Sequence, residues 1–402
     1  MLPKKPTGKT SIGNMEVVKM LEQCLESAKL GKTSFAVVVM SDNPYHVVST
    51  HAGDMMMCMS AYWGLDQAKH RLMVTMAERH SLPVNIEGTA DSNHFFYNMS
   101  KGPACYDFVV WLIIAEMTRR RSGAPSPLKV SFAMGIDSDQ EKALHNQYRK
   151  IMYDGVIKPA LALIGAEEIE PEEGAKAAVL ERYTLGPIVE FAKNGEQVPR
   201  LTAPQYATDA VAEYVGDKPP ITITLRECAY WEHRNSNLTE WFRVAEDLEA
   251  RGNRVVFIRD TSKVLRDDNG VPIGVEPISG FEVCAAPSWD LHARMALYEQ
   301  AKCNLFVSNG PMVLGLFGSR PWMMFVELDP LNNYFCETPQ FYAQWQGLGP
   351  EENFPWSKPT QRMIYKRDTY DNIIEAWNKL EPLLEMRPLL QKDLRKIPEA
   401  AE

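Results

Sequence analysis

Apolar residues along this chain fall into two series that predict alternating strands and helices. In the first series a short strand at 93–98, an apolar helix at 107–121 and a strand at 127–134 follow one another. A strand, a helix and a second strand in this order, with a connection long enough to cross the sheet, predict a parallel βαβ unit. Beyond the second strand the pattern predicts a helix at 140–164 that Pro159 kinks or splits, an acidic solvated connection at 167–174 and a weakly patterned segment at 175–201. The second series begins at Ile221 with the strand ITITL and alternates helices and strands up to Val326, with a loop expected at 262–280, a short strand at 281–285 and an irregular stretch at 332–360. The pattern therefore predicts an α/β fold with two units of similar construction.

The chain in front of these units is patterned differently. Apolar segments at 34–40 and 45–50 are separated by the turn signal Ser-Asp-Asn-Pro, which predicts an antiparallel hairpin. A Met-rich helical segment follows, and such clusters are usually core filler. The Gly-Asp-Lys-Pro-Pro sequence at 216–220 predicts a linker between the two larger units. The predicted organisation is a disordered tail at 1–14, a small α+β unit at 15–88, α/β units at 89–216 and 217–380, and a C-terminal helix and tail at 381–402.

Composition narrows the class of protein. The 402 residues are 45% hydrophobic and 24% charged, which predicts a soluble globular chain. A net charge of −9 argues against a general nucleic-acid binder but leaves a nucleotide ligand open. Seven scattered cysteines without metal-ligand spacing predict reduced thiols, a cytoplasmic location and no metal site. No apolar run is long enough to span a bilayer, so any membrane association is expected to be peripheral.

The segment 304–322, NLFVSNGPMVLGLFGSRPW, predicts a strand, a turn of small residues and a new helix. Ser308, Asn309 and Gly310 allow a ligand to approach the backbone closely. Pro311 suits the first position of the helix, where its missing N–H costs nothing. The free N–H groups and the dipole of that helix would attract an anion such as a phosphate. The alternative is an ordinary strand–turn–helix junction with a Ser or Asn cap.

Two arginines strengthen the phosphate interpretation. Arg226 follows the strand ITIT, and Arg234 and Asn235 lie just before the next helix, which Asn237 is placed to cap. Because the carboxyl ends of parallel strands share one edge of a sheet, we expect these residues to lie beside Ser308–Pro311. Planar guanidinium groups bind phosphate oxygens well, so the edge is a predicted diphosphate site. The alternatives are that Arg226 pairs with a neighbouring glutamate and that Arg234 faces solvent.

The order of these elements resembles the donor-binding half of GT-B glycosyltransferases. The SNGP turn is similar to the GP-type turn of heptosyltransferase-like enzymes, and the strand-end Arg226 is similar to the diphosphate-binding arginine of GT-B fucosyltransferases. The resemblance covers about residues 220–380. It implies two Rossmann-like units facing a cleft, with a nucleotide-sugar donor on the C-terminal unit and a glycan or glycolipid acceptor on the N-terminal unit. The small unit at 15–88 is not part of the usual pattern.

The resemblance also implies roles for individual residues. Carried over by position, the diphosphate would be held by Arg226, Arg234, Asn235, Ser308, Asn309, Gly310 and Pro311. Glu299 would reach a ribose hydroxyl, unless it lies on the solvated face of its helix. Because arginines and helix N-termini can stabilise a leaving diphosphate, neither a metal nor a cofactor is needed.

The general base has two candidates. Asp137 lies in a loop at a strand's carboxyl end, where it also suits a capping role. Asp107 follows the first strand and its loop, and it also fits the start of the next helix. The predicted function is a metal-independent glycosyltransferase of polysaccharide biosynthesis. Two alternatives stay open, namely a nucleotide-sugar epimerase or hydrolase of the same fold and a non-catalytic interaction protein.

Overall fold

A computed structural model of the chain divides into two compact units, Met1–Asn85 and Ile86–Glu402. Each unit is described by itself. Within them the structure describes residues 35–37, 47–49, 93–99, 102–133, 149–170, 178–180, 183–229, 231–329 and 337–394, with side chains masked in the two N-terminal segments and beyond 385.

The first unit is represented by one hairpin. Strands β1 (Phe35–Val37) and β2 (Val47–Ser49) pair in antiparallel register. This pairing confirms the hairpin expected from the two apolar segments around Ser-Asp-Asn-Pro. The predicted tail at 1–14 and the predicted Met-rich helices lie outside the described residues.

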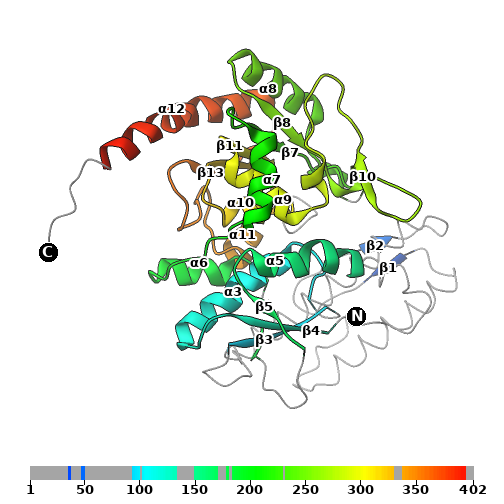
Figure 1. Ribbon diagram of the computed structural model, residues 1–402, viewed down its shortest axis with the longest axis vertical. Helices are drawn as coiled ribbons and strands as arrows, with labels where there is room; N and C mark the ends of the chain where they lie inside the picture. Colours follow the sequence, from blue (N-terminus) through cyan, green and yellow to red (C-terminus); the bar gives the residue numbers. More distant parts are fainter. Residues whose placement is uncertain are drawn as a thin grey trace, which may run out of the picture. The chain divides into compact units, whose positions relative to one another are not determined.

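The second unit begins with a four-stranded parallel sheet in the order β5-β4-β3-β6 (Figure 1). Strands β3 (His94–Asn98) and β4 (Lys129–Ala133) are joined by helix α3 (Asp107–Ser122), as the βαβ pattern predicts. Helix α3 ends at Gly123, whose φ of 72° lies in the left-handed region that favours glycine. We refer to this sheet and its helices as the first half of the second unit.

Two segments of the first half differ from expectation. The acidic segment after Ala166, predicted to be a solvated connection, begins as strand β5 (Glu167–Glu168), and the weakly patterned segment beyond it holds β6 (Ala178–Val179) and α6 (Gly186–Lys193). These strands have two residues each, too few to show a sequence period. The helix expected to kink at Pro159 contains a π-helical turn, Tyr153–Ile157, followed by α5 (Lys158–Ala162).

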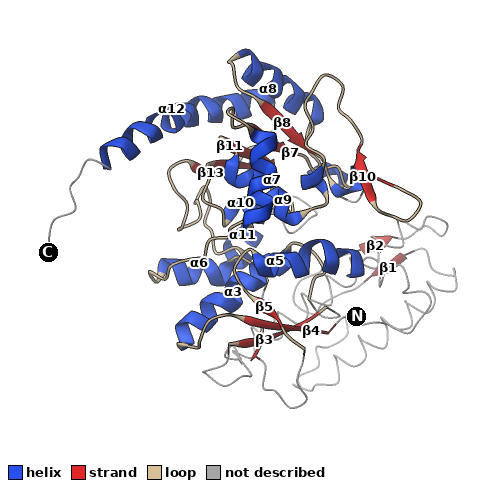
Figure 2. Cartoon of the chain, viewed as in Figure 1, coloured by secondary structure: helices blue, strands red, loops and turns tan. Residues whose placement is uncertain are grey.

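The second half is a five-stranded parallel sheet in the order β13-β12-β11-β7-β8. Helices lie on both of its faces (Figure 2), with α8 (Leu238–Ala250) and α12 (Tyr370–Leu394) on one and α9 (Leu291–Gln300) and α10 (Met312–Leu316) on the other. The strands are β7 (Ile221–Thr224), β8 (Val255–Ile258), β11 (Cys303–Val307), β12 (Trp322–Phe325) and β13 (Gln361–Ile364).

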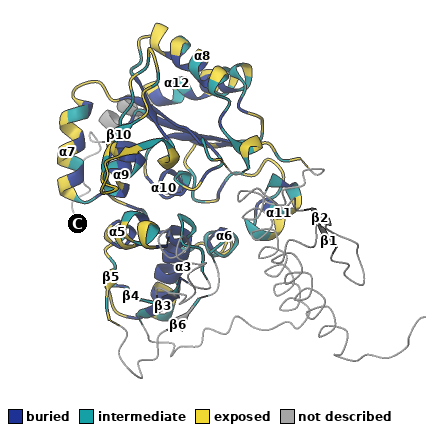
Figure 3. Cartoon of the chain, turned by 90° about the vertical axis from the view of Figure 1, so that its right-hand side faces the viewer, coloured by how far each residue is buried: buried dark blue, intermediate teal, exposed yellow. Residues whose placement is uncertain are grey.

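Alternate strand residues serve the two faces of this sheet. Ile223 and Leu305 pack with α8 and α12, whereas Phe306 and Met324 pack with α9 and α10. The central strands are buried throughout (Figure 3), which explains why they read as continuous apolar runs in the sequence. Burial on both faces fixes the strand positions, and therefore fixes where each strand's carboxyl end lies.

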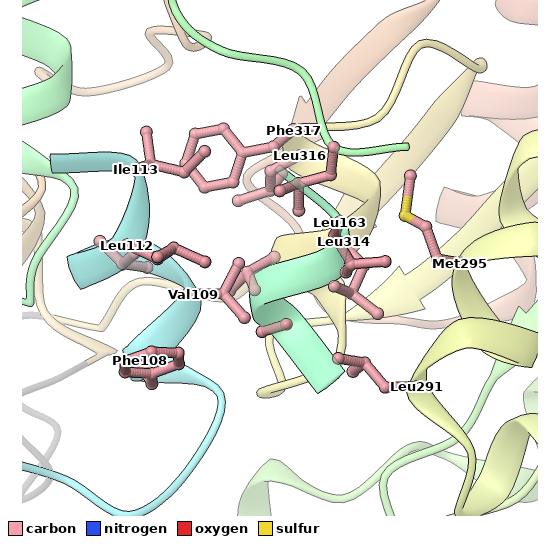
Figure 4. Close-up of a cluster of buried hydrophobic side chains, with 14 of the residues drawn as sticks. Phe108, Val109, Leu112, Ile113, Leu163, Leu291, Met295, Leu314, Leu316 and Phe317 are labelled. Carbon is pink, nitrogen blue, oxygen red and sulfur yellow. The ribbon is translucent and has the colours of Figure 1, made fainter. Parts of the chain in front are cut away.

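The two halves share one hydrophobic core. Side chains of α3, including Val109 and Leu112, pack in the same cluster as Leu314 and Leu316 of α10 and Met295 of α9 (Figure 4). Helix α7 (Gln205–Val215), which precedes the predicted linker at 216–220, packs beside α9 (Figure 1). The start of α3 is therefore held against the edge of the second sheet by continuous packing.

Three expectations for the second half are corrected. The predicted loop at 262–280 contains a hairpin of β9 (Val264–Arg266) and β10 (Pro272–Val275). The strand expected at 281–285 is reduced to a single bridge between Phe257 and Val283. The irregular stretch after 332 contains helix α11 (Pro339–Trp345). Within the described part of the chain, the helices lack the combination of length and apolar character needed to cross a bilayer.

Candidate functional site

The loop from Arg226 to Asn237 is braced by its own side chains. Buried Arg226 donates through Nη1 to the Trp231 carbonyl at 2.9 Å and to Asn235 Oδ1 at 2.6 Å. Asn235 also exchanges hydrogen bonds with the backbone of Cys228. Glu227, one of the neighbouring carboxylates considered for Arg226, is instead ion-paired with Arg259 at 2.7 Å. Arg226 therefore shapes the loop from within.

Arg234 joins the two loops that were predicted to share an edge. Its Nη2 donates to the carbonyl and the hydroxyl of Ser308 at 3.2 and 3.4 Å, and its Nε donates to Glu337 Oε1 at 2.6 Å. The guanidinium also lies over the Trp231 ring, 5.4 Å from its centroid. Trp231 has a φ of 53°, an unusual backbone conformation for a residue other than glycine. The Trp231 ring therefore packs against one face of the Arg234 guanidinium group.

The turn after β11 differs from expectation in its hydrogen bonding. Helix α10 has five residues, and Pro311 is its N-cap rather than its first residue. Asn309 Oδ1 accepts from Met312 N at 3.0 Å, while the next two N–H groups donate to the carbonyls of Gly310 and Pro311. The helical N–H groups expected to bind an anion are therefore already used, because the small residues that open the turn also close it on itself.

The start of α8 differs from expectation in its capping. Asn237 is the N-cap, as predicted, but makes no side-chain cap hydrogen bond. Asp368 contacts this helix start instead, and its Oδ2 accepts from Asn237 N and from Trp241 Nε1, both at 2.8 Å. A carboxylate from a distant segment thus lies beside the start of α8, and Arg234 is the cation that joins the two loops.

Asp107 lies at the first position of α3 and faces this edge. The N-cap of the helix is Tyr106, so the capping role considered for Asp107 is not the one it has. Burial raises the pKa of the Asp107 carboxyl, while a hydrogen bond from the Cys105 thiol and the guanidinium of Arg234 oppose the rise. The candidate base of the first half is therefore within electrostatic range of the cation in the second half. The other candidate base, Asp137, lies outside the described residues.

Tyr106 forms the contact between α3 and the Ser308–Pro311 turn. A Cβ atom added to Gly310 would lie 3.0 Å from Tyr106 Cδ2 and 3.2 Å from Tyr106 Cβ. Gly310 is thus required where a tyrosine from the other half lies against the backbone. The close approach predicted for a ligand at this glycine is made in the structure by a side chain of the protein.

Glu299 is not brought to this edge. It lies near the end of α9, just before β11 starts, whereas Ser308 follows the opposite end of that strand. Its Oε2 accepts from Ala203 N at 3.2 Å, and burial raises the pKa of its carboxyl. Glu299 therefore joins α9 to the segment before α7, and neither a ribose contact nor full solvation describes its surroundings.

Sequence reasoning missed several residues of the site. Glu337 lies in a stretch without a helical or strand period, so nothing in the sequence points to its pairing with Arg234. Tyr106 and Trp231 are single aromatic residues in loops, and the proximity of Tyr106 to Gly310 depends on packing between the two halves. Tyr106 precedes Asp107 directly, and this is the one signal that a sequence reading could have used.

Comparison with known proteins gives similarity at the level of structure. No protein-family model and no curated protein sequence matches the chain. Among solved structures, it is similar to the dodecameric glycosyltransferase TibC from enterotoxigenic E. coli, with a TM-score of 0.39, 18% identity, and coverage of 72% of this chain and 76% of that one. The family 9 glycosyl transferase from Veillonella parvula gives 0.40 at 10% identity, covering 72% and 97%. E. coli ADP-heptose LPS heptosyltransferase II gives 0.33 at 12% identity, covering 75% and 77%.

The predicted fold class, α/β with two Rossmann-like units, is confirmed by the two parallel sheets of residues 86–402. A fold alone does not fix a reaction. The function is therefore argued from the contacts at the edge shared by Asp107, Arg234 and Ser308.

Proposed function

We propose that this protein is a glycosyltransferase that moves a sugar from a nucleotide-diphosphate sugar to a hydroxyl of a glycan or glycolipid. The observation that supports this most directly is the contact of Tyr106, the residue before Asp107, with Gly310 in the turn whose Ser308 accepts from Arg234. A carboxylate facing a cation that joins two strand-end loops suits a reaction that removes a proton on one side and stabilises a departing anion on the other.

In the proposed reaction Asp107 acts as general base. Its carboxylate takes the proton of the acceptor hydroxyl while that oxygen attacks the anomeric carbon of the donor. The bond between the anomeric carbon and the diphosphate oxygen breaks, and its electron pair stays on the diphosphate. Arg234, held against Ser308 and Trp231, stabilises the new negative charge. We propose that the reaction needs no metal, because the arginine side chain supplies the positive charge.

Ligand-dependent stability is the first test of this function. Unfolding of the full chain is followed with UDP, GDP, ADP and CMP compounds, and one of these classes is expected to raise the unfolding temperature. Saturation at 100 times the dissociation constant adds about 2.7 kcal/mol to the stability. The variant Arg234→Met should lose most of this shift. If no nucleotide stabilises the wild-type chain, the proposal is wrong.

Transfer itself separates the proposal from related reactions. Incubation of the donor with and without a glycan acceptor, followed by product analysis, should show a new glycoside that depends on the acceptor. Asp107→Asn should lower transfer by at least about 100-fold, the lower end of the usual contribution of a general base. Donor conversion without an acceptor would favour an epimerase or a hydrolase instead.

A further inference from the structure

Arg294 is a buried cation that the proposed reaction does not use. It lies on α9 and is 1% exposed. Its Nε donates to the Pro287 carbonyl at 2.6 Å, and the nearby Tyr298 hydroxyl bonds Thr224 Oγ1 on β7. Within the described residues its Nη1 has no hydrogen-bond partner, and no carboxylate lies within ion-pair distance of its guanidinium.

Arg294 is a buried charge without an ion-pair partner in the described part of the chain, which is unusual in a folded protein. Leaving a buried cation without a counter-charge is unfavourable, so buried arginines are normally paired with carboxylates. Burial alone would lower the pKa of Arg294, but Tyr106, Tyr298 and Asp260 around it raise the pKa instead. The oxygens that surround the guanidinium therefore favour its charged form, although none of them supplies a partner for Nη1.

Two other residues also have a buried polar atom without a hydrogen-bond partner among the described residues. Ser288, which follows Pro287 directly, is 1% exposed, and its Oγ has no partner among the described residues. Asn309, which precedes Gly310, has a buried Nδ2 without a partner in the same part of the chain. Both residues belong to loops at the edge where Arg234 meets Ser308. Three buried polar atoms with unused hydrogen-bonding capacity are thus found on α9 and on the loops at 286–288 and 308–311.

Tyr106 lies between this group and the first half. Its ring rests on Gly310, and the tyrosine is close enough to Arg294 for the guanidinium to lower its pKa against the rise caused by burial. Tyr106 as a residue is half-buried, whereas Arg294, Ser288 and Asn309 are buried.

We propose that Arg294 is the floor of an anion subsite, closed by Tyr106 in this structure, whose ligand is an oxygen of the donor's diphosphate. This inference rests on the proposed function, and it adds a second cation to the site. Arg234 would bind the diphosphate at the exposed side of the edge, and Arg294 would bind it from below once Tyr106 turns away. Because Tyr106 precedes Asp107, donor binding would also act on the segment that positions the base.

The subsite is tested by binding of inorganic pyrophosphate and of nucleoside diphosphates to the full chain. Arg294→Met should weaken both by at least about tenfold, while the affinity for the matching nucleosides stays unchanged. The matched control is Arg200→Met, because Arg200 also donates to backbone carbonyls, those of Gly318 and Trp356, but does so away from this edge. Arg200→Met is expected to bind pyrophosphate as the wild type does.

Removal of the covering side chain provides an independent measurement. Tyr106→Ala should tighten pyrophosphate binding about three- to tenfold, because the ligand no longer has to displace the ring. This result decides the question even if Arg294→Met fails to fold. Weaker binding by Tyr106→Ala, or unchanged pyrophosphate binding by a folded Arg294→Met, would overturn the subsite.

The outcomes also separate the subsite from the proposed function. If Arg234→Met abolishes binding of nucleoside diphosphates and Arg294→Met leaves that binding unchanged, the proposed subsite is wrong but the proposed function is still supported. If the wild type binds neither pyrophosphate nor any nucleoside diphosphate, both fall together.

Discussion

Arg234 and Glu337 form an ion pair that restricts the conformations of both side chains. Their side chains are 14% and 12% exposed, and the Nε–Oε1 distance is 2.6 Å. A carboxylate at this distance neutralises the charge that a phosphate would bind, and it also orients the guanidinium toward Ser308. The pair therefore makes two separable contributions, one to stability and one to ligand binding.

A double-mutant experiment separates these contributions. Arg234→Met removes the closer cationic partner of the nearly buried Glu337 carboxylate, leaving His233 Nε2 at 3.7 Å, and should destabilise the chain by about 1–3 kcal/mol. Adding Glu337→Gln should restore most of that stability but none of the nucleotide binding. Urea unfolding and isothermal calorimetry of the two variants measure both quantities. Recovery of binding in the double variant would show that Arg234 acts only by neutralising Glu337.

The surroundings of Asp107 predict a pH dependence. Because burial raises its pKa, the carboxylate needed for catalysis forms only above the usual range of an aspartate, so transfer should rise with pH through that raised value. The same shift means that the protonated form favours folding, and this contribution is present at low pH and lost as the pH rises through the folded-state pKa.

Cys105 supplies the matching variant for this prediction. Its thiol hydrogen bond lowers the pKa of Asp107, so Cys105→Ala should move the acidic limb of the kcat/KM profile to higher pH. Ser122→Ala, at the far end of α3, serves as the control and should leave the limb in place. A limb that does not respond to Cys105→Ala, or that persists in Asp107→Asn, would assign the titration to another group.

At the scale of elements, the strand-end turns depend on contacts that arrive from elsewhere in the chain. Gly310 lies against Tyr106, whose Cβ is fixed by the backbone at the start of α3 and does not move when the ring rotates. Gly310→Ala should therefore destabilise the chain by about 1–3 kcal/mol through overpacking. Gly274→Ala, where a new Cβ meets nothing within 4 Å, is the matched control and should change the stability by less than about 0.5 kcal/mol. Urea unfolding of both variants gives the comparison, and equal stability would contradict it.

The elements also show how far a sequence can be read. The central strands and α3, α8 and α9 were predicted because apolar period and stop signals such as Gly123 are local. The occupied helix ends were not. Asp368 lies just before α12, but its carboxylate accepts a hydrogen bond from Asn237 N at the start of α8, more than a hundred residues earlier in the chain. Local pattern identifies a helix end, but tertiary packing decides which group satisfies it.

The residues of the candidate site also fall into those that local sequence pattern predicted and those that only tertiary packing brings together. Arg234 and the Ser308 turn were placed at one edge from the rule for parallel strands, and the structure brings them into contact. Glu299 was assigned from the resemblance alone and lies toward the opposite edge. Glu337, Tyr106 and Arg294 meet the site through side chains from distant segments, so no spacing in the sequence could reveal them.

At the scale of the whole unit, the core shared by the two halves determines how residues 86–402 respond to destabilising mutations. Helix α3 of the first half and α9 and α10 of the second half pack in one cluster (Figure 4), while α8 and α12 pack in another on the far face of the five-stranded sheet. The buried strands contribute to both clusters, so each cluster is joined to the other through the sheet. We therefore expect the two halves to lose their structure together.

Matched leucine truncations test this expectation. Leu112 on α3 and Leu248 on α8 are both fully buried, one in each cluster. Leu112→Ala and Leu248→Ala should each cost about 2–5 kcal/mol of stability. If the halves unfold as one, Leu112→Ala will speed hydrogen exchange in β7 and β11 of the second sheet as much as in β3 and β4 of the first, and Leu248→Ala will do the same in reverse. Faster hydrogen exchange confined to the mutated half would show that the two halves unfold separately. In that case the shared core would not be what aligns Asp107 with Arg234, and the alignment would depend on the bound ligand.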